Sequence, residues 1–366
     1  MSEPRIRVTY RLQATAAQAG ARAEALALEQ SIEMPVEAVT DARVLREVVA
    51  RVEAVEPETG STALARVALS GESVGSDAGQ LMNMLFGNSS LHADVQVVDV
   101  DVPESLAATF GGPRLGVDGV RALLGAHGRP LTCTALKPIG STPAQLAALA
   151  GACARAGLDL IKDDHGWADQ PSAPYEARVA ACQRAVLDAN AATGGRTLYL
   201  PSLCGHHGQM QRQIAYARRL GVQAFLVAPM NCGVATFCAL AQEHPDVLLM
   251  AHPALAGRAF APPALLGRLF RLFGADATIF PNHGGRFSYS RDDCLGIAQA
   301  ARAPWRGLKP TLPVPAGGMG VERVPEILRE YGPDSVLLIG GSLLMARERL
   351  AERAREFVQA VAGVAR

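Results

Sequence analysis

Two apolar runs in the chain end directly in residues that can carry chemistry. The first ends in Lys137, and a later one ends in Lys162, Asp164 and His165. Because side chains alternate along a strand, Lys162 and Asp164 share one side, and His165 just beyond the end can turn toward them. An aspartate oxygen, a histidine nitrogen and a further anionic oxygen would suit a divalent cation. The competing interpretation is structural: Lys162 would form salt bridges with the two aspartates at the strand end, Asp163 and Asp164.

Lysine is rare in this chain. The 35 Lys+Arg include only three lysines, Lys137, Lys162 and Lys309, and arginine fills every other cationic position. A lysine kept against this bias indicates a function that a guanidinium cannot perform, such as losing a proton to become a nucleophile, a base or a carbamate. Two of the three follow neighbouring predicted strands, which favours chemistry at that point.

Two glycine pairs follow the last two apolar runs, Gly317-Gly318 and Gly340-Gly341. Backbone N–H groups after the seventh and eighth strands of an α/β barrel commonly bind a phosphate, and glycine allows the anion to approach them closely. Two tight turns are the alternative explanation. The placement of a pair after both strands favours phosphate.

Two histidines, His252 and His283, end two further apolar runs. A lone histidine at a strand end is as often structural as catalytic, so these residues by themselves leave both roles open. Their position beside the other polar strand ends makes them candidates for the lining of one shared site.

The elements that must hold these residues alternate strictly between strand and helix after a Gly- and Pro-containing link near 111–116. Eight strand-like runs are expected, at 131–137, 158–163, 196–202, 224–229, 247–252, 277–281, 311–316 and 335–340. Helical stretches are expected between and after them, at 143–156, 175–192, 208–220, 233–243, 262–273, 291–302, 321–331 and 346–363. Eight such units are the count for a (β/α)₈ TIM barrel, with a doubly wound sheet as the lesser alternative. Barrels keep their chemistry at the carboxyl ends of the strands, where all of the candidate residues above would gather.

The first 110 or so residues mix strands and helices without strict alternation. Strands are expected at 5–13, 34–39, 50–56, 62–69 and 93–102, and helices at 15–31 and 77–87. This pattern is typical of an α+β domain. We therefore expect an α/β protein with an N-terminal α+β domain over 1–112 and a C-terminal barrel over 113–366 that carries the metal and phosphate sites.

The bulk properties exclude several classes of function. The formal net charge is zero and no basic stripe is visible, so nucleic acid is not an expected partner. No stretch of 18 residues is apolar throughout, so no membrane span is expected. The seven cysteines lie singly, without a CxxC pair, and no secretory leader is recognisable. We expect a cytoplasmic protein with free thiols.

These motifs together resemble those of the RuBisCO large-chain superfamily, and in particular its RuBisCO-like branch, which does not fix carbon. The likeness spans nearly the whole chain and rests on Glu29-Gln-Ser31, Val55-Glu-Pro57, Gly87-Asn88, Leu136-Lys-Pro138, Ile161-Lys-Asp-Asp164, Ala251-His252, His283-Gly284, Leu312-Pro-Val314, Ala316-Gly-Gly318, Ser335-Val-Leu337 and Gly340-Gly341. It implies an N-terminal ferredoxin-like domain on a (β/α)₈ barrel. It also implies an obligate homodimer in which the N-terminal domain of one subunit completes the active site of its partner.

The resemblance also implies roles for single residues. Lys162 would react with CO₂ to give a carbamate that holds one Mg²⁺ together with Asp164, and Lys137 would be an acid or base at the reacting carbon. Glu29 and Asn88 would reach in from the partner subunit. His252 and His283 would line the site, and the two glycine pairs would bind the substrate's phosphate.

Four departures from the family pattern narrow the expected reaction. His165 stands where the family has a glutamate as its third metal ligand. The site should therefore bind Mg²⁺ more weakly, or bind another metal in preference to it. Pro253 replaces an arginine that grips a second phosphate, and Ile139 replaces a lysine that carboxylases need. The loop 285–291 contains no lysine to polarise CO₂. Carbon fixation is therefore not expected, and the substrate should be a sugar or sugar-acid monophosphate.

The remaining residues would make and hold an enolate, which several reactions share. Our first expectation is a decarboxylase of 3-oxo-isoapionate 4-phosphate, because the Lys-Asp-Asp-His-Gly form together with Glu29-Gln-Ser31 looks most like that subgroup. The alternative is an enolase or isomerase of 5-methylthioribulose 1-phosphate-type substrates in methionine salvage, for which Met34 and Met230 offer some apolar lining. Carboxyl transfer or hydrolysis is a third variant. A sugar-phosphate sensor without catalysis is the non-enzyme alternative.

Overall fold

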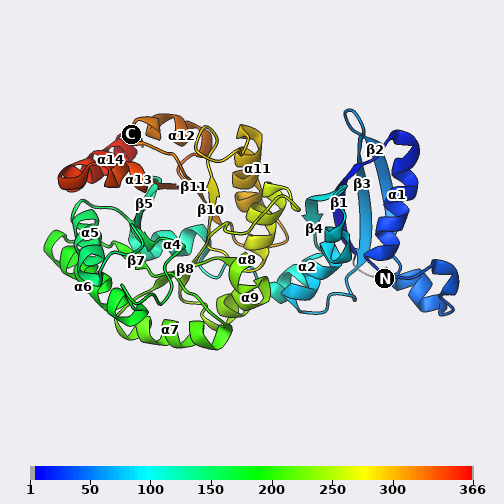
Figure 1. Ribbon diagram of the computed structural model, residues 1–366, viewed down its shortest axis with the longest axis horizontal. Helices are drawn as coiled ribbons and strands as arrows, with labels where there is room; N and C mark the ends of the chain where they lie inside the picture. Colours follow the sequence, from blue (N-terminus) through cyan, green and yellow to red (C-terminus); the bar gives the residue numbers. More distant parts are fainter. Residues whose placement is uncertain (1–4, 365–366) are drawn as a thin grey trace.

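The computed structural model describes residues 5–364 and consists of a small sheet domain beside a larger barrel (Figure 1). Within that range no helix combines the length and the apolar character needed to cross a membrane.

The N-terminal part is one four-stranded antiparallel sheet, in the order β2-β3-β1-β4, with helices packed on it. Its elements are β1 (Arg5–Gln13), α1 (Ala16–Glu29), β2 (Arg51–Pro57), β3 (Thr62–Ser70), α2 (Ala78–Phe86) and β4 (Val95–Asp101). Strand β1 buries every second residue, such as Val8 and Tyr10, against apolar residues of α1 such as Ala23 and Leu26. This βαββαβ order confirms the expected ferredoxin-like domain.

One predicted strand of this region, 34–39, is wrong. The structure has a single 3₁₀ turn there, η1 (Val36–Ala38), followed by a short π-helical segment, η2 (Val44–Val48). None of the residues in η1 or η2 is buried. The segment therefore lacks the packed face that a strand added to this sheet would need.

The C-terminal part contains eight parallel strands, as predicted. They are β5 (Leu131–Leu136), β6 (Leu160–Asp163), β7 (Leu198–Leu200), β8 (Ala224–Val227), β9 (Leu248–Ala251), β10 (Ala277–Pro281), β11 (Leu312–Ala316) and β12 (Val336–Leu338). They form two ladders, β12-β5-β6-β7 and β8-β9-β10-β11. A parallel bridge between Ser202 and Leu226 joins the two ladders on one side. On the other side β11 packs beside β12, which closes the barrel.

Helices surround the barrel and cover its outer face (Figure 1). The main ones are α5 (Pro143–Arg155), α6 (Tyr175–Thr193), α7 (His207–Arg219), α9 (Val234–Glu243), η4 (Pro263–Leu269) continuing into α10 (Phe270–Leu272), α11 (Arg291–Arg302), α12 (Val324–Tyr331) and α14 (Leu350–Val364). Short helices lie in the loops of the barrel, namely α8 (Pro229–Cys232), η5 (Val321–Arg323), α13 (Gly341–Leu344) and η6 (Arg347–Arg349). In the N-terminal part η3 (Asn88–Leu91) precedes β4, and α3 (Glu104–Phe110) and α4 (Gly116–Leu124) lie between β4 and β5.

Helix α4 closes one end of the barrel. Its residues Val117 and Val120 join the interior cluster formed by strand residues such as Leu131, Leu160 and Val314. Because α4 precedes β5, it seals the amino-terminal end of the strands. The carboxyl end is left as the mouth, which is where the candidate site residues follow their strands.

Strand β4 attaches the N-terminal sheet to the barrel. Val97 exchanges backbone hydrogen bonds with Ala259 (2.9 Å) and Ala261 (2.7 Å) in the segment after β9, and Trp305 donates from Nε1 to Asp101 at 3.0 Å. These contacts hold the two parts together within one chain. The exact boundary at residue 112 stays a prediction.

Candidate active site

Side chains alternate along β6, so Asp163 and Lys162 lie on opposite sides of the strand. Asp163 points outward and is buried, where it accepts hydrogen bonds from Arg178 (3.0 Å) and Tyr199 (2.7 Å). Lys162 lies on the other side of the strand, with the barrel interior. Asp163 therefore has a structural role between strand and helices. The salt bridge at this strand end is made by Arg178 and does not involve Lys162.

Lys162 is almost completely buried, with 3% of its surface exposed. Its Nζ donates a hydrogen bond of 3.0 Å to the backbone oxygen of Asp163. Burial lowers the pKa of the Lys162 amine and the Lys137 cation adds to the effect, although Asp164 and Cys133 oppose it. An amine that releases its proton more readily than usual is the form that can react with CO₂.

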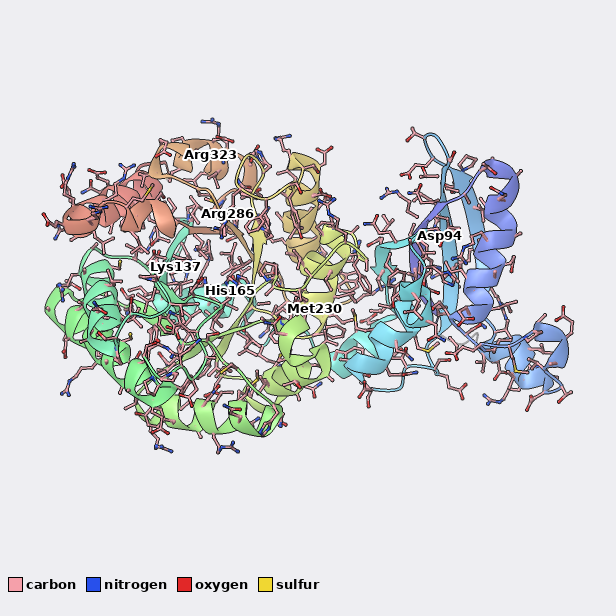
Figure 2. All side chains as sticks on the ribbon, viewed as in Figure 1. Asp94, Lys137, His165, Met230, Arg286 and Arg323 are labelled. Carbon is pink, nitrogen blue, oxygen red and sulfur yellow. The ribbon has the colours of Figure 1, made fainter. Side chains whose placement is uncertain are left out.

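Asp164 lies between two nitrogen donors at the mouth. Nζ of Lys137 donates to Oδ2 at 2.8 Å, and Nδ1 of His165 lies 3.4 Å from Oδ1. Burial raises the pKa of the Asp164 carboxyl, but the hydrogen bonds from His165 and Lys137 outweigh it, so the pKa lies well below its usual range. Asp164 is therefore an anion available to a cation. Figure 2 shows Lys137 and His165 near the middle of the barrel.

The rings of His165 and His252 stack on each other, with centroids 4.1 Å apart and planes inclined by 12°. Burial, with further contributions from Lys162 and His165, lowers the pKa of His252 to about 2, so its imidazole is neutral near neutral pH. Nδ1 of His252 accepts a hydrogen bond of 3.1 Å from the backbone N–H of Ala254. The proton of the neutral ring is thus assigned to Nε2. The stack brings together two strand ends that are far apart in the sequence.

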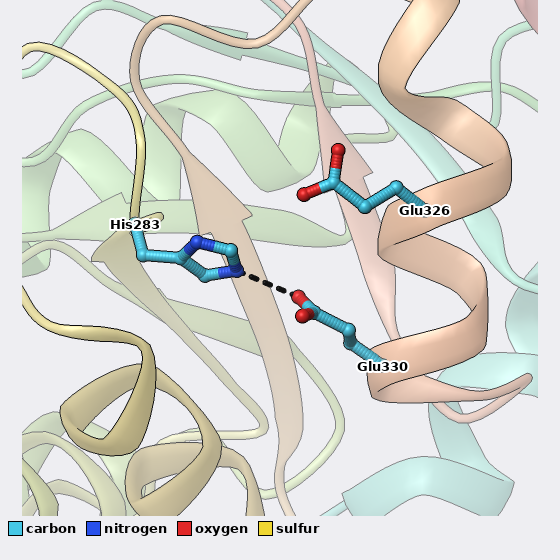
Figure 3. A group of neighbouring side chains, drawn as sticks. All are labelled: His283, Glu326 and Glu330. Carbon is cyan, nitrogen blue, oxygen red and sulfur yellow. Dashed lines mark hydrogen bonds and ion pairs between the residues drawn. The ribbon is translucent and has the colours of Figure 1, made fainter.

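His283 follows β10 and belongs to a network that the sequence analysis missed (Figure 3). Its Nε2 pairs with Glu330 at 2.7 Å, and Glu330 is also bound by Arg291 at 2.7 Å. Glu326, one turn earlier on α12, lies in the same group and pairs with Arg323 at 2.8 Å. Since each glutamate has its own arginine, this group is an ion-pair network. The spacing of Glu326 and Glu330 on a predicted helix signalled a shared face, but nothing local signalled that His283 lies opposite.

The two glycine turns lie at the mouth as predicted. Gly317 and Gly318 have φ values of 81° and 73°, a backbone conformation that residues other than glycine rarely adopt. Oγ of Ser342 donates to the backbone oxygen of Met319 at 2.7 Å, which ties the turn after β12 to the turn after β11. A Cβ at Gly340 would lie 3.9 Å from Cε of Lys137. The Gly340-Gly341 pair therefore neighbours Lys137, and Ser342 links it to the turn of Gly317 and Gly318.

Glu29 and Asn88 lie together but apart from this mouth. Nδ2 of Asn88 donates to Oε1 of Glu29 at 3.0 Å. Glu29 ends α1, which Figure 1 shows on the far side of the N-terminal sheet from the barrel. Within one chain these two residues do not join Lys137 and Asp164.

A ferredoxin-like domain in front of a (β/α)₈ barrel, with lysines and a carboxylate at the strand ends beside two glycine turns, defines the class as a barrel enzyme built like RuBisCO. Comparison with known proteins bears this out. Residues 116–277 match the family model of the ribulose bisphosphate carboxylase large chain, catalytic domain. The chain is 53% identical over 363 residues to a 5-methylthioribulose-1-phosphate isomerase of Rhodospirillum rubrum, covering 99% of this chain and 97% of the relative. The chain therefore belongs to the RuBisCO large-chain family, among its RuBisCO-like proteins.

Two further similarities extend along the chain. A crystal structure of a Rubisco-like protein from Rhodopseudomonas palustris superposes with a TM-score of 0.93 at 49% identity, covering 99% of this chain and 98% of that one. A 2,3-diketo-5-methylthiopentyl-1-phosphate enolase of Geobacillus kaustophilus is 33% identical over 290 residues, which is 77% of this chain and 70% of the relative. These enzyme names favour the isomerase or enolase alternative over our first expectation, the decarboxylase.

Proposed function

We propose that this chain is an isomerase that moves a proton between neighbouring carbons of a ketose monophosphate of the 5-methylthioribulose 1-phosphate type. The observation that carries the proposal is the pairing of Lys137 with Asp164 at 2.8 Å on the interior side of β6, next to the buried amine of Lys162. The relative that is 53% identical over nearly the whole chain and bears an isomerase name supports this reaction over decarboxylation.

A divalent cation fits the residues present. Lys162, as a carbamate formed with CO₂, would hold it with Asp164 and His165, because this set supplies two anionic oxygens and an imidazole nitrogen. The lowered pKa of the buried Lys162 amine supports carbamate formation, and the low pKa of Asp164 supports binding of a cation. Mg²⁺, when bound, would polarise the substrate oxygens and favour an enolate. The imidazole of His165 should make softer metals more competitive than they are at an all-oxygen site.

The protein's own residues would handle the proton. Lys137 has a partly exposed amine at the mouth. Once its ammonium has given a proton to solvent, the neutral amine can take a proton from one carbon beside the carbonyl and return it to the next. His252 is neutral and keeps its proton on Nε2, so it can donate a hydrogen bond to oxygen as negative charge develops there. No proton or carbon is lost in the sum of the two transfers, which makes the reaction an isomerisation.

The glycine turns are proposed to hold the phosphate. The backbone N–H groups of Gly317, Gly318, Gly340 and Gly341 are free of Cβ atoms that would keep an anion away, and Ser342 ties the two turns together. Pro253 offers no cation for a second phosphate. This supports a monophosphate.

An exposed apolar side chain near the mouth supports a substrate with an apolar tail. Ile139 is 51% exposed. It lies over Gly166, where a Cβ would come within 2.5 Å of its Cδ1. Such a side chain favours a methylthio group over the carboxylate that a decarboxylase substrate carries. Neither Met34 nor Met230 is needed for this lining.

A homodimer with shared sites is proposed to complete the machinery. Asn88 hydrogen-bonds to Glu29, the last residue of α1, and α1 lies across the N-terminal sheet from the barrel. If they act on the substrate, they must do so in the site of a second copy.

The test is to incubate the protein with Mg²⁺ and bicarbonate in D₂O and to follow 5-methylthioribulose 1-phosphate by NMR. A new ketose phosphate, formed with all carbons retained, is the expected result; deuterium in it would reveal proton exchange with solvent during transfer. Release of CO₂ from 3-oxo-isoapionate 4-phosphate, with no reaction of the methylthio compound, would establish the decarboxylase instead. Binding of either compound without any reaction would favour the sensor.

A further inference from the structure

The loop after β10, residues 284–290, packs directly on the first glycine turn. A Cβ at Gly285 would lie 2.2 Å from the backbone oxygen of Gly317, and a Cβ at Gly318 would lie 2.9 Å from Cα of Gly285. On its outer side the loop is held by Arg258, which donates to Oγ of Ser288 at 2.8 Å. The position of this loop over the turn is therefore set by backbone contact on one side and a side-chain hydrogen bond on the other.

Arg286 is the residue that this packing brings next to the turn. Its backbone nitrogen would lie 3.1 Å from a Cβ at Gly318. Its guanidinium rests over the ring of Phe287, 4.9 Å from the centroid. In the range 5–364 no carboxylate comes within ion-pair distance of it. Figure 2 shows Arg286 between Arg323 and His165 in the view down the barrel.

Three of the other cations around the mouth pair with carboxylates, and Arg258 donates to Ser288 instead. Lys137 pairs with Asp164, and Arg323 pairs with Glu326. Arg291 pairs with Glu330. Backbone N–H groups of glycine supply hydrogen bonds to an anion but no net positive charge, so a phosphate bound at the turn would need a cation from elsewhere.

We propose that Arg286 is that cation: it binds the phosphate monoester held over Gly317 and Gly318, and so selects doubly charged phosphate over neutral groups at this end of the substrate. The inference rests on the proposed function in placing the phosphate at the glycine turns. A planar guanidinium resting on an aromatic ring keeps its N–H groups free at its edge, which suits recognition of two phosphate oxygens at once.

The test measures binding of inorganic phosphate to the full-length protein by calorimetry, without turnover. Arg286→Gln should weaken phosphate binding by about tenfold or more, and Arg286→Lys should restore part of it because a point charge remains. Arg219→Gln is the matched control, since Arg219 also lies over an aromatic ring, that of Tyr216 at 5.4 Å, but at the end of α7. An unchanged melting temperature should accompany each variant.

Turnover separates this inference from the proposed function. With the ketose phosphate as substrate, Arg286→Gln should raise KM with little change in kcat. If the parent protein binds phosphate and loses it in Arg286→Gln but isomerises nothing, the inference stands and the isomerase proposal fails. If the parent isomerises the substrate and Arg286→Gln changes neither phosphate affinity nor KM, the inference is overturned. Equal losses in Arg286→Gln and Arg219→Gln, or no phosphate binding by the parent, would also overturn it.

Discussion

Nζ of Lys137, at the end of β5, donates a hydrogen bond of 2.8 Å to Oδ2 of Asp164, which follows β6. The two strands pair in parallel, with Leu136 opposite Asp163, so adjacent strand ends bring the amine and the carboxylate together. The pair joins the residue that we propose to move the proton to a residue that we propose to hold the metal. Because both draw on one carboxylate, the ammonium of Lys137 and a metal cation compete for Asp164.

Replacing Lys137 should separate catalysis from metal binding. Lys137→Met should lower kcat by about a hundredfold to ten-thousandfold, because the group that transfers the proton is gone. Its affinity for Mn²⁺, followed by electron paramagnetic resonance, should stay the same or rise, because a competing cation has been removed from Asp164. Asp164→Asn should lose both catalytic activity and Mn²⁺ binding. Weaker metal binding in Lys137→Met would contradict the proposed division of roles.

Lys162 should be required for activation by CO₂. Lys162→Met should lower Mg²⁺-dependent turnover by about three orders of magnitude, because the side chain can no longer become an anionic ligand. The melting temperature should hold or rise, since a buried amine is replaced by an apolar chain of similar length. Lys309→Met is the control, because the Lys309 amine donates to the backbone oxygen of Arg114, just before α4. Preincubation with bicarbonate should stimulate the parent and the control but not Lys162→Met.

Mixed dimers should show whether sites are shared. Neither Glu29→Gln nor Lys162→Met should be active alone. After unfolding and refolding together in equal amounts, they should regain about a quarter of the parental activity, because half of the dimers would carry one intact site. Glu29→Gln mixed with Asn88→Ala should regain nothing, since every mixed site then carries one defect. No recovery in the first mixture, with dimers verified by light scattering, would contradict the shared site.

The turn at Gly318 should tolerate no side chain. Gly318→Ala should weaken binding of inorganic phosphate and destabilise the fold, because its Cβ would approach Cα of Gly285 at 2.9 Å in addition to the strain of a φ of 73°. Gly128→Ala is the matched control: its φ is 69°, but nothing lies within 4 Å of the added Cβ. The control should lose about 1 kcal/mol of stability and no phosphate affinity. Equal effects of the two changes on phosphate affinity would rule out a role for the Gly318 turn.

Asp276 should make the fold less stable as the pH rises. It is buried beside the start of β10 and accepts backbone hydrogen bonds from Leu115, Gly116 and Leu249. Burial raises its pKa to about 6 from 3.8, against the effect of those hydrogen bonds. The folded state therefore binds the proton more tightly than the unfolded state. Its contribution to stability is complete below pH 3.8 and is lost as the pH rises through about 6.

Urea unfolding at several pH values measures this effect. Each pKa unit corresponds to about 1.4 kcal/mol, so the free energy of unfolding attributable to Asp276 should fall by a few kcal/mol between about pH 4 and pH 7. Asp276→Asn should remove this part of the pH dependence. Asp188→Asn, at an exposed position of α6, should not. An identical pH profile for parent and Asp276→Asn would contradict the raised pKa.

Much of this protein could be predicted from its sequence because the signals are local. Strict alternation of apolar runs and helical stretches predicted all eight barrel strands, and the alternation within β6 predicted that Lys162 and Asp164 would share a side. The scarcity of lysine drew attention to Lys137 and Lys162, and the order of the motifs indicated the family. The failed strand at 34–39 shows the limit, because its residues had no sheet face to pack against.

Only the tertiary structure decided which side chains meet. The stacking of His165 on His252 and the pairing of His283 with Glu330 join residues that are 87 and 47 positions apart. Likewise, the approach of Arg286 to Gly318 depends on how the loop after β10 packs on the neighbouring turn. Periodicity along a chain determines an element and the face it buries, but contacts between elements follow from the closure of the whole barrel, in which every strand end is positioned by its neighbours.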